Sequence, residues 1–178
     1  MLRRTVIQGV LIAAALASRP TTAPGQDADA SPSLELPADH PLQDYFHAGS
    51  LMKSGQPDEA VYWFYRGQLR YRIYLSAHPE LPPDGEPAVS ASMNAMLGEP
   101  INQYAFGDIP KLAATLGRVL AWHDANDDPF TPKAKFAAAP KQQRDGLAGL
   151  RAKILAERGA IREQRRKNGL PNRTQPAR

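Results

Sequence analysis

Residues 57–77 read PDEAVYWFYRGQLRYRIYLSA, and the four residues 62–65 are all aromatic. Pro57 suits the first turn of a helix, and Asp58 and Glu59 suit its positive end. Successive helical side chains point about 100° apart, so four aromatic residues in a row cover nearly the whole circumference. A helix that is apolar all round is usually enclosed by other helices. The sequence therefore predicts that residues 57–77 form the central helix of the fold.

Capping residues and apolar spacing predict the helices around this central one. Asp39 and Asp108 are suited to helix N-caps, and Gly98 with Pro100 predicts the end of a helix. The expected helices span residues 39–53, 87–97, 109–124 and 140–168. No segment shows sustained alternation of apolar and polar residues, so little β-structure is expected. The predicted fold is all-α, a compact bundle of about five helices with a central aromatic-rich helix and a long C-terminal helix.

The N-terminal residues have the pattern of an export signal. Arg3 and Arg4 precede a mostly apolar run of about 12 residues, which is shorter than the roughly 20 needed to span a bilayer. Small residues follow that suit signal-peptide cleavage. The expected organisation is a signal peptide and leader over residues 1–30 and a flexible linker over 31–38. A single helical domain over 39–168 and a frayed basic tail over 169–178 would complete the chain.

Composition and charge narrow the functions that fit this chain. The chain has no cysteine, which excludes disulfides and thiolate chemistry. Residues 31–150 carry 10 basic and 14 acidic side chains, whereas residues 151–178 carry 9 basic and 2 acidic ones. An export signal argues against nucleic acid as the target of this basic end. An acidic protein surface or peripheral contact with an anionic membrane through the basic C-terminal helix fits better.

Residues 44–72 resemble one helical hairpin of the tetratricopeptide repeat family. The small residues of that repeat are matched by Ala48, Ala60 and Gly67, which let two helices approach closely. Two positions depart from the family pattern: Asp44 replaces a tryptophan and Arg72 replaces a proline. No second copy follows at the expected interval of about 34 residues, so the resemblance implies a local hairpin and not a repeat array. Hairpins of this family commonly serve as protein-binding surfaces.

Four residues are the candidate binding residues: Trp63, Arg66, Arg70 and Tyr104. Trp63, Arg66 and Arg70 share one face of the predicted central helix because they are three and four residues apart. Arginine can stack on the tryptophan, and the two guanidinium groups form a fork for a carboxylate or phosphate. The alternative is that both arginines pair with acids of the fold itself, such as Asp58, Glu59 or Asp108.

Catalytic and metal-binding patterns are incomplete in this sequence. The segment Asp124-x-Asn126-x-Asp128 begins like a calcium loop, but Pro129 and Lys135 replace its essential glycine and glutamate. His78 and Glu80 lie in a proline-rich loop and could bind a metal ion or transfer protons. Because these patterns are incomplete, the sequence predicts no catalytic residue, no metal ligand and no cofactor.

The sequence therefore favours an exported periplasmic protein that acts as a non-enzymatic protein-binding or scaffold module. One alternative is an immunity protein that neutralises an exported toxin. Another is a small metal- or ligand-dependent envelope enzyme that would use His78, Glu80 and Asp108. Whether the protein is an enzyme is left open, with binding preferred.

Overall fold

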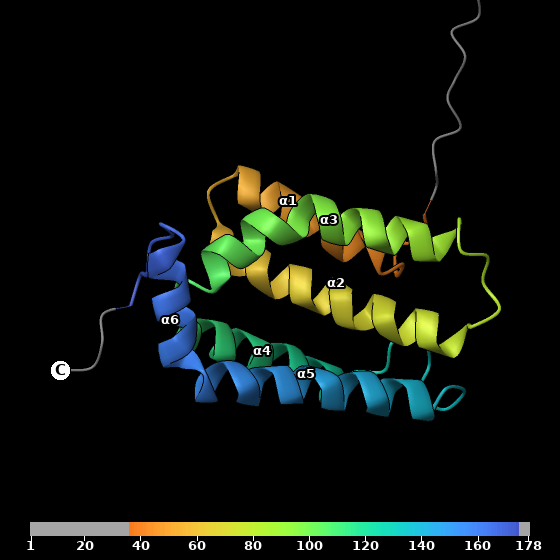
Figure 1. Cartoon of the computed structure of the whole chain (residues 1–178). Coiled ribbons are helices and arrows are strands. Elements are labelled where there is room, and N and C mark those ends of the chain that lie inside the picture. Colours follow the sequence, from red (N-terminus) through yellow and green to blue (C-terminus); the bar gives the residue numbers. More distant parts are fainter. Residues whose placement is uncertain (1–35, 175–178) are drawn as a thin grey trace, which may run out of the picture. The chain divides into compact units, whose positions relative to one another are not determined.

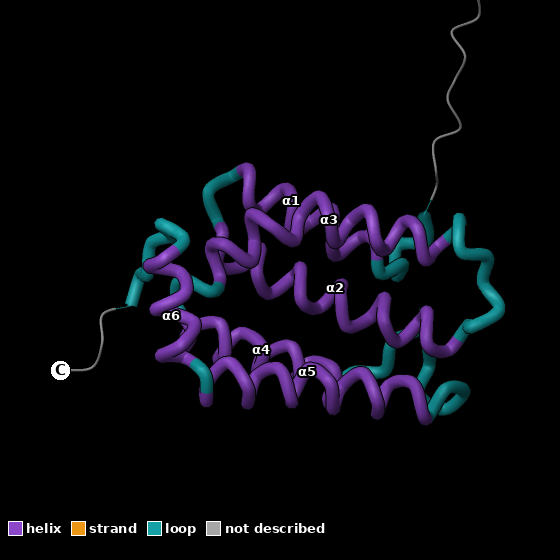
Figure 2. The backbone as a smooth tube through the Cα atoms, in the orientation of Figure 1, coloured by secondary structure: helices purple, strands orange, loops and turns teal. Residues whose placement is uncertain are grey.

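A computed structural model describes residues 36–174, and the described part contains six α-helices and no strand. The helices are α1 (Leu42–Lys53), α2 (Pro57–Ala77), α3 (Glu86–Ala105), α4 (Ile109–Ala125), α5 (Ala138–Ala156) and α6 (Arg158–Lys167). The predicted signal peptide and leader, and most of the predicted linker, lie outside the described residues. The helices connect through short turns and loops (Figure 2). The all-α prediction is confirmed.

The helices are stacked with α2 in the middle (Figure 1). Helices α1 and α3 lie on one side of α2, helices α4 and α5 lie on the other, and α6 crosses one end of the bundle. The central helix contacts all four of its neighbours. Phe64, Tyr65 and Tyr71 are buried in this core, whereas Tyr62 and Trp63 are half-buried. The aromatic sequence of α2 therefore predicts its central place correctly.

Helices α1 and α2 form an antiparallel hairpin with an unusually close contact. Gly55 makes the turn with a φ of 75°, a conformation that favours glycine. A Cβ atom added to Gly67 would lie 2.8 Å from the Cβ of Asp44, closer than side-chain carbons can approach. Ala48 and Ala60 are fully buried. These small residues therefore allow the close approach that the sequence analysis expected of them.

The third helix does not end at Gly98 as predicted. It continues through Gly98 and Pro100 to Ala105. Gly98 lies beside the ring of Phe64, where an added Cβ atom would make an ordinary contact at 3.6 Å. Beyond it, Ile101 and Ala105 are buried in the core, and their packing favours continuation of the helix. Pro100 removes the hydrogen bond to the carbonyl of Met96, but both residues are exposed, and water can solvate that carbonyl.

The long C-terminal helix predicted for residues 140–168 is two helices that meet at Glu157. A straight helix of that length would span about 43 Å, whereas the central helix spans about 32 Å. The change of direction keeps the end of the chain on the bundle. After it, Ile161 packs on the core, and the buried Arg165 donates a hydrogen bond to the carbonyl of Gln103 at 2.9 Å.

The two ends of the helical domain also differ from the prediction. The first helix begins at Leu42 and not at Asp39, because residues 37–40 form a turn closed by a bond from His40 N–H to the Pro37 carbonyl. Residues 169–174, expected to be frayed, run back along α6. Arg173 there donates its backbone N–H to the carbonyl of Gly107 at 2.7 Å. Asp108 caps α4 through the N–H of Lys111, as predicted.

Candidate functional site

The structure brings Arg66 and Arg70 together with two aspartates in what we call the ion-pair cluster: Asp44, Arg66, Arg70 and Asp128. Arg66 donates its Nε and Nη2 hydrogens to Asp44 at 2.9 and 2.6 Å. Arg70 donates Nε and Nη2 hydrogens to Asp128 at 2.8 and 3.0 Å, and its Nη1 reaches Asp44 at 3.4 Å. Arg70 also donates to the carbonyl of Asp39.

The ion-pair cluster is charge-balanced and lies inside the fold. The Arg70 side chain is 6% exposed, and its partners Asp128 and Asp44 are 6% and 3% exposed. Burial opposes the charge of Arg70, yet the hydrogen bonds that it donates to Asp128 and the nearby charge of Asp44 leave its pKa above the usual value. Removing one member of such a group would leave a buried charge without its partner. The cluster therefore ties α1, α2 and the loop after α4 together.

Arg66 is also enclosed by two tryptophans. Its guanidinium carbon lies 3.8 Å from the centroid of the Trp63 ring and 4.7 Å from that of Trp122 on α4. The predicted cation–π contact between Trp63 and Arg66 is therefore present, with a second aromatic partner. The Arg66 side chain is 16% exposed. An external anion that approached this group would compete with Asp44, so the proposed binding role of Trp63, Arg66 and Arg70 stays a prediction.

Tyr104, the fourth candidate, lies apart from the other three. Its hydroxyl donates a hydrogen bond to Asp58 at 2.8 Å, and the Arg173 guanidinium stacks on its ring at 3.5 Å. Lys111 donates to the same carboxylate at 2.6 Å and lowers the pKa of Asp58. Asp58 begins α2, and Arg70 lies about 18 Å further along that helix. Tyr104 therefore fastens the C-terminal segment to the bundle at a separate place.

The acids named as alternative partners of the two arginines are engaged elsewhere. Asp58 pairs with Lys111, Glu59 pairs with Arg118, and Asp108 caps α4. The pairing of Asp128 with Arg70 was not predicted from the sequence, because the two residues are 58 positions apart. Asp44 was noticed only as a departure from the repeat pattern. Asp44 stands where the repeat has a large apolar residue, and this acid at a position expected to be buried could have indicated a buried basic partner.

The residues of the enzyme hypothesis do not meet in space. His78 and Glu80 are joined by a 2.9 Å hydrogen bond in the loop after α2, whereas Asp108 lies near the opposite end of that helix, where Lys111 pairs with Asp58. The acids of the calcium-like loop also diverge, because Asp124 pairs with Arg144 and Asp128 pairs with Arg70. Within residues 36–174, no group of three or more His, Asp or Glu side chains is placed to hold a metal ion.

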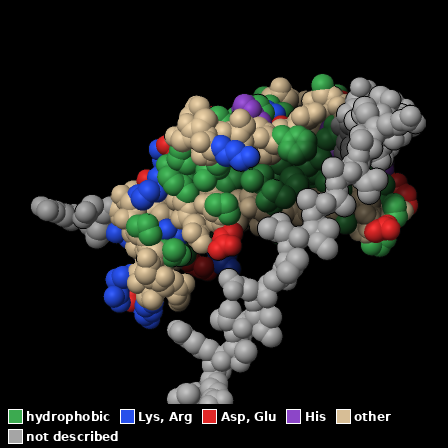
Figure 3. Space-filling model, turned by 90° about the horizontal axis from the view of Figure 1, so that it is seen from above, with side chains coloured by type: hydrophobic (Ala, Val, Ile, Leu, Met, Phe, Trp, Pro, Cys, Tyr) green, Lys and Arg blue, Asp and Glu red, His purple; other side chains and the backbone are tan. Residues whose placement is uncertain are grey.

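Helices α1 and α3 expose an apolar surface, which we call the apolar face: Phe46, Met93, Met96 and Leu97. Phe46 is 52% exposed and Met96 is 65% exposed. The two helices meet where Leu97 packs over Gly49. Residues 87–98 of α3 contain no charged side chain. Seen from the side of α1 and α3, apolar side chains form an extended green area (Figure 3).

Helix α6 and the start of α4 enclose a pocket of about 760 Å³, which we call the arginine pocket. Ile109, Pro110 and Leu155 form its apolar wall. Its polar lining comes from α6 and the segment after it, through Arg158, Arg162, Glu163, Arg166, Asn172 and Thr174. The volume falls in the range of small-molecule and peptide-end sites. The sequence analysis identified the basic character of this helix but not the pocket, which exists only because the chain turns at Glu157.

Comparison with protein-family models, with curated proteins and with solved structures gives no significant match for the chain. In the part of the chain that the structure describes, none of the helices combines the length and apolar character needed to cross a membrane.

Proposed function

We propose that this protein is an exported, non-enzymatic protein-binding module of the bacterial periplasm that contacts its partner through the apolar face. The export signal in the sequence supports the location. The exposed side chains of Phe46 and Met96 on neighbouring helices support the mode of binding.

The observation that carries this proposal is that Phe46 and Met96 are exposed on neighbouring helices and that residues 87–98, which include Met96, carry no charged side chain. Soluble monomers rarely expose contiguous apolar patches unless these serve binding. Phenylalanine and methionine are enriched at protein interfaces, and charged residues are depleted from interface cores. Helix α3 carries acids only at Glu86 and Glu99, which flank this uncharged stretch. This composition matches the core of a protein interface.

The hairpin of α1 and α2 supports the same proposal from the sequence side. Its resemblance to a tetratricopeptide hairpin implies a protein-binding surface, and Phe46 lies on the first helix of that hairpin. Fold resemblance alone does not assign function. The exposed apolar side chains on the hairpin and on α3 add the chemical reason for an interaction.

Site-specific photo-cross-linking in intact cells tests the proposal. A photoreactive phenylalanine analogue is placed at Phe46 and, as a matched control, at Lys141, whose side chain is 77% exposed on α5. Helices α1 and α5 lie on opposite sides of α2 (Figure 1). We expect a discrete protein adduct from position 46 and none from position 141. The same adducts from both positions, or none from position 46, would reject the apolar face as a binding surface.

The identity of the adduct distinguishes the alternatives. A toxin cross-linked at position 46 would select the immunity hypothesis within the same binding mode. Cross-linking to lipid would replace the protein partner by a membrane surface. The membrane contact proposed for the basic α6 predicts instead that release from anionic vesicles depends on salt, because exposed charge contacts are screened over about 10 Å at 0.1 M.

A further inference from the structure

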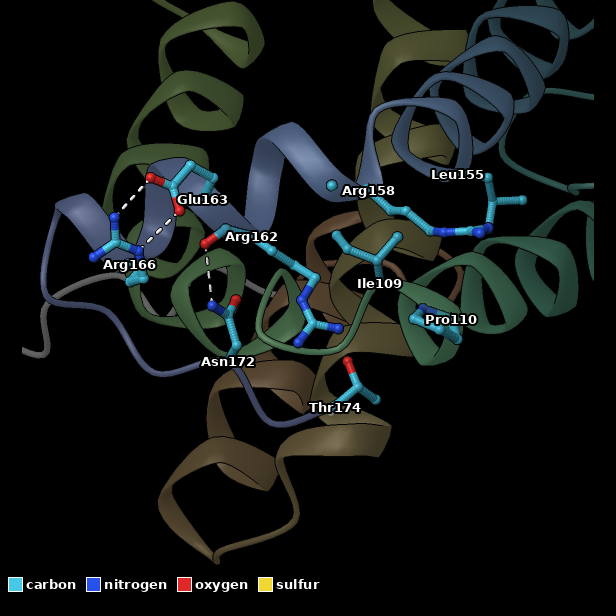
Figure 4. Close-up of a pocket in the computed structure, with 10 residues that line it drawn as sticks. Ile109, Pro110, Leu155, Arg158, Arg162, Glu163, Arg166, Asn172 and Thr174 are labelled. Atoms are coloured by element: carbon cyan, nitrogen blue, oxygen red, sulfur yellow. Dashed lines mark hydrogen bonds and ion pairs between the residues drawn. The ribbon is translucent and has the colours of Figure 1, made fainter. Parts of the chain in front are cut away.

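Two arginines of the arginine pocket have no acidic partner in the described part of the chain. Arg158 and Arg162 are one helical turn apart on the same face of α6. Within residues 36–174, neither side chain forms a salt bridge. Figure 4 shows Arg162 extending across the pocket toward Ile109 and Thr174, and Arg158 lying on the side of Leu155.

The next arginine on this face is engaged within the helix. Arg166 donates two hydrogen bonds to Glu163, each 2.8 Å long, and turns away from the other two arginines (Figure 4). The one acidic residue among those that line the pocket is thereby neutralised. Of the two remaining arginines, Arg162 extends into the pocket and can form bidentate hydrogen bonds to an anion, while Arg158 adds a positive charge on the side of Leu155 (Figure 4).

The opposite wall selects for an apolar group attached to that anion. Ile109 and Pro110 come from the first turn of α4, and Leu155 comes from the last turn of α5. A pocket of about 760 Å³ is much larger than a small inorganic anion needs. The lining therefore matches a ligand that joins a carboxylate-like head to a side chain of moderate size.

We infer that the arginine pocket binds the C-terminal carboxylate of a polypeptide whose last side chain is apolar. This inference rests on the proposed protein-binding function and names the chemistry of a second contact with the partner. The carboxylate accepts hydrogen bonds from Arg162, Arg158 adds positive charge at the edge of the pocket, and the last side chain packs against Ile109, Pro110 and Leu155. Capture of a terminal carboxylate is a recurrent mode of peptide recognition.

The surroundings of the pocket favour a peptide end over a lipid head group. A protein that docks on a membrane inserts large apolar side chains beside its basic groups. The large exposed apolar side chains of the described residues, Phe46 and Met96, lie on α1 and α3 and not on α6.

The test is a titration of the full chain with the peptide Ala-Gly-Ala-Leu, acetylated at its N-terminus, followed by NMR. The same peptide with a C-terminal amide serves as the ligand control, since it differs only in charge and one acceptor atom. We expect the free acid to bind at least about tenfold more tightly than the amide, with shifts centred on α6 and the start of α4. Inorganic phosphate should not displace it.

Two variants locate the site. Arg158→Gln with Arg162→Gln should abolish the preference for the free acid, whereas Lys167→Gln removes one charge from α6 outside the pocket and should preserve it. Equal binding of acid and amide by the unaltered protein, or displacement by phosphate, would overturn the inference without any variant. The cross-linking at Phe46 is independent of this result, so a protein adduct there with no peptide binding here would refute the pocket alone.

Discussion

Two arginine pairs with the same spacing have opposite surroundings in this molecule. Arg66 and Arg70 on α2 are four residues apart, as are Arg158 and Arg162 on α6. The first pair is held by Asp44 and Asp128, with four hydrogen bonds of 2.6 to 3.0 Å. The second pair lines an open pocket and forms no salt bridge with the described residues.

This comparison shows that a spacing of four residues places two arginines on one face of a helix. The spacing does not determine whether the pair binds a ligand or stabilises the fold. The α2 pair was the predicted anion-binding site because it lies beside Trp63. That pair instead meets acids from distant parts of the chain, which turn a potential binding fork into a structural connection. Among the described residues, the acid next to the α6 pair is engaged elsewhere, because Glu163 pairs with Arg166 and Lys167.

The largest effect is expected from removing the centre of the ion-pair cluster. Arg70→Ala leaves Asp128 and part of Asp44 buried without a partner, and we expect the free energy of unfolding to fall by about 3–5 kcal/mol. Urea denaturation followed by circular dichroism measures this loss. Arg158→Ala serves as the matched control and should change stability by less than about 0.5 kcal/mol. Equal losses of stability in the two variants would contradict the claim that the first arginine pair is structural and the second is not.

The close contact of α1 and α2 gives a second, smaller effect. Gly67→Ala places a Cβ atom against Asp44 and should destabilise the protein by about 1–3 kcal/mol through forced separation of the helices. The exposed Gly146 of α5 has no atom within 4 Å of an added Cβ. Gly146→Ala should therefore stabilise by up to about 1 kcal/mol. A neutral Gly67→Ala variant would show that Asp44 is held less tightly than described.

Local patterns in the sequence predicted much of the fold, and long-range contacts account for most of the differences. The bounds of α2 agree with the prediction, because its capping and aromatic signals lie within the helix itself. The helix end at Gly98 and the continuous helix over residues 140–168 were predicted wrongly because α3 continues to bury Ile101 and Ala105 in the core, and because the chain turns at Glu157 near the end of the bundle. The ion-pair cluster joins residues up to 58 positions apart, so its partners could not be assigned from spacing.

The smallest expected effect is a loss of stability in acid that comes from His123, in the last turn of α4 and just before the loop that carries Asp128. Burial, and then the nearby charge of Lys133, lowers the pKa of His123 below its ordinary value. The folded protein therefore resists protonation of His123 more than the unfolded chain does. Stability should be constant above the ordinary histidine pKa of about 6.5 and should fall as the pH drops below it.

Thermal unfolding at about pH 7.5 and about pH 5.5 measures this dependence. His123→Phe should reduce the loss of melting temperature on acidification, because the titrating group is gone. An unchanged pH dependence of the melting temperature in His123→Phe would show that other groups cause the acid sensitivity. The sensitivity would then not report on the segment that holds Asp128.

The most direct test of the contrast between the two arginine pairs is hydrogen exchange of their guanidinium groups in the unaltered protein. Arginine Nε–H signals in ¹⁵N NMR spectra report whether each hydrogen is protected from water. The account predicts slow exchange for Arg66 and Arg70, whose Nε–H groups donate to Asp44 and Asp128, and rapid exchange for Arg158 and Arg162. Comparable protection of both pairs, or rapid exchange at Arg70, would contradict it.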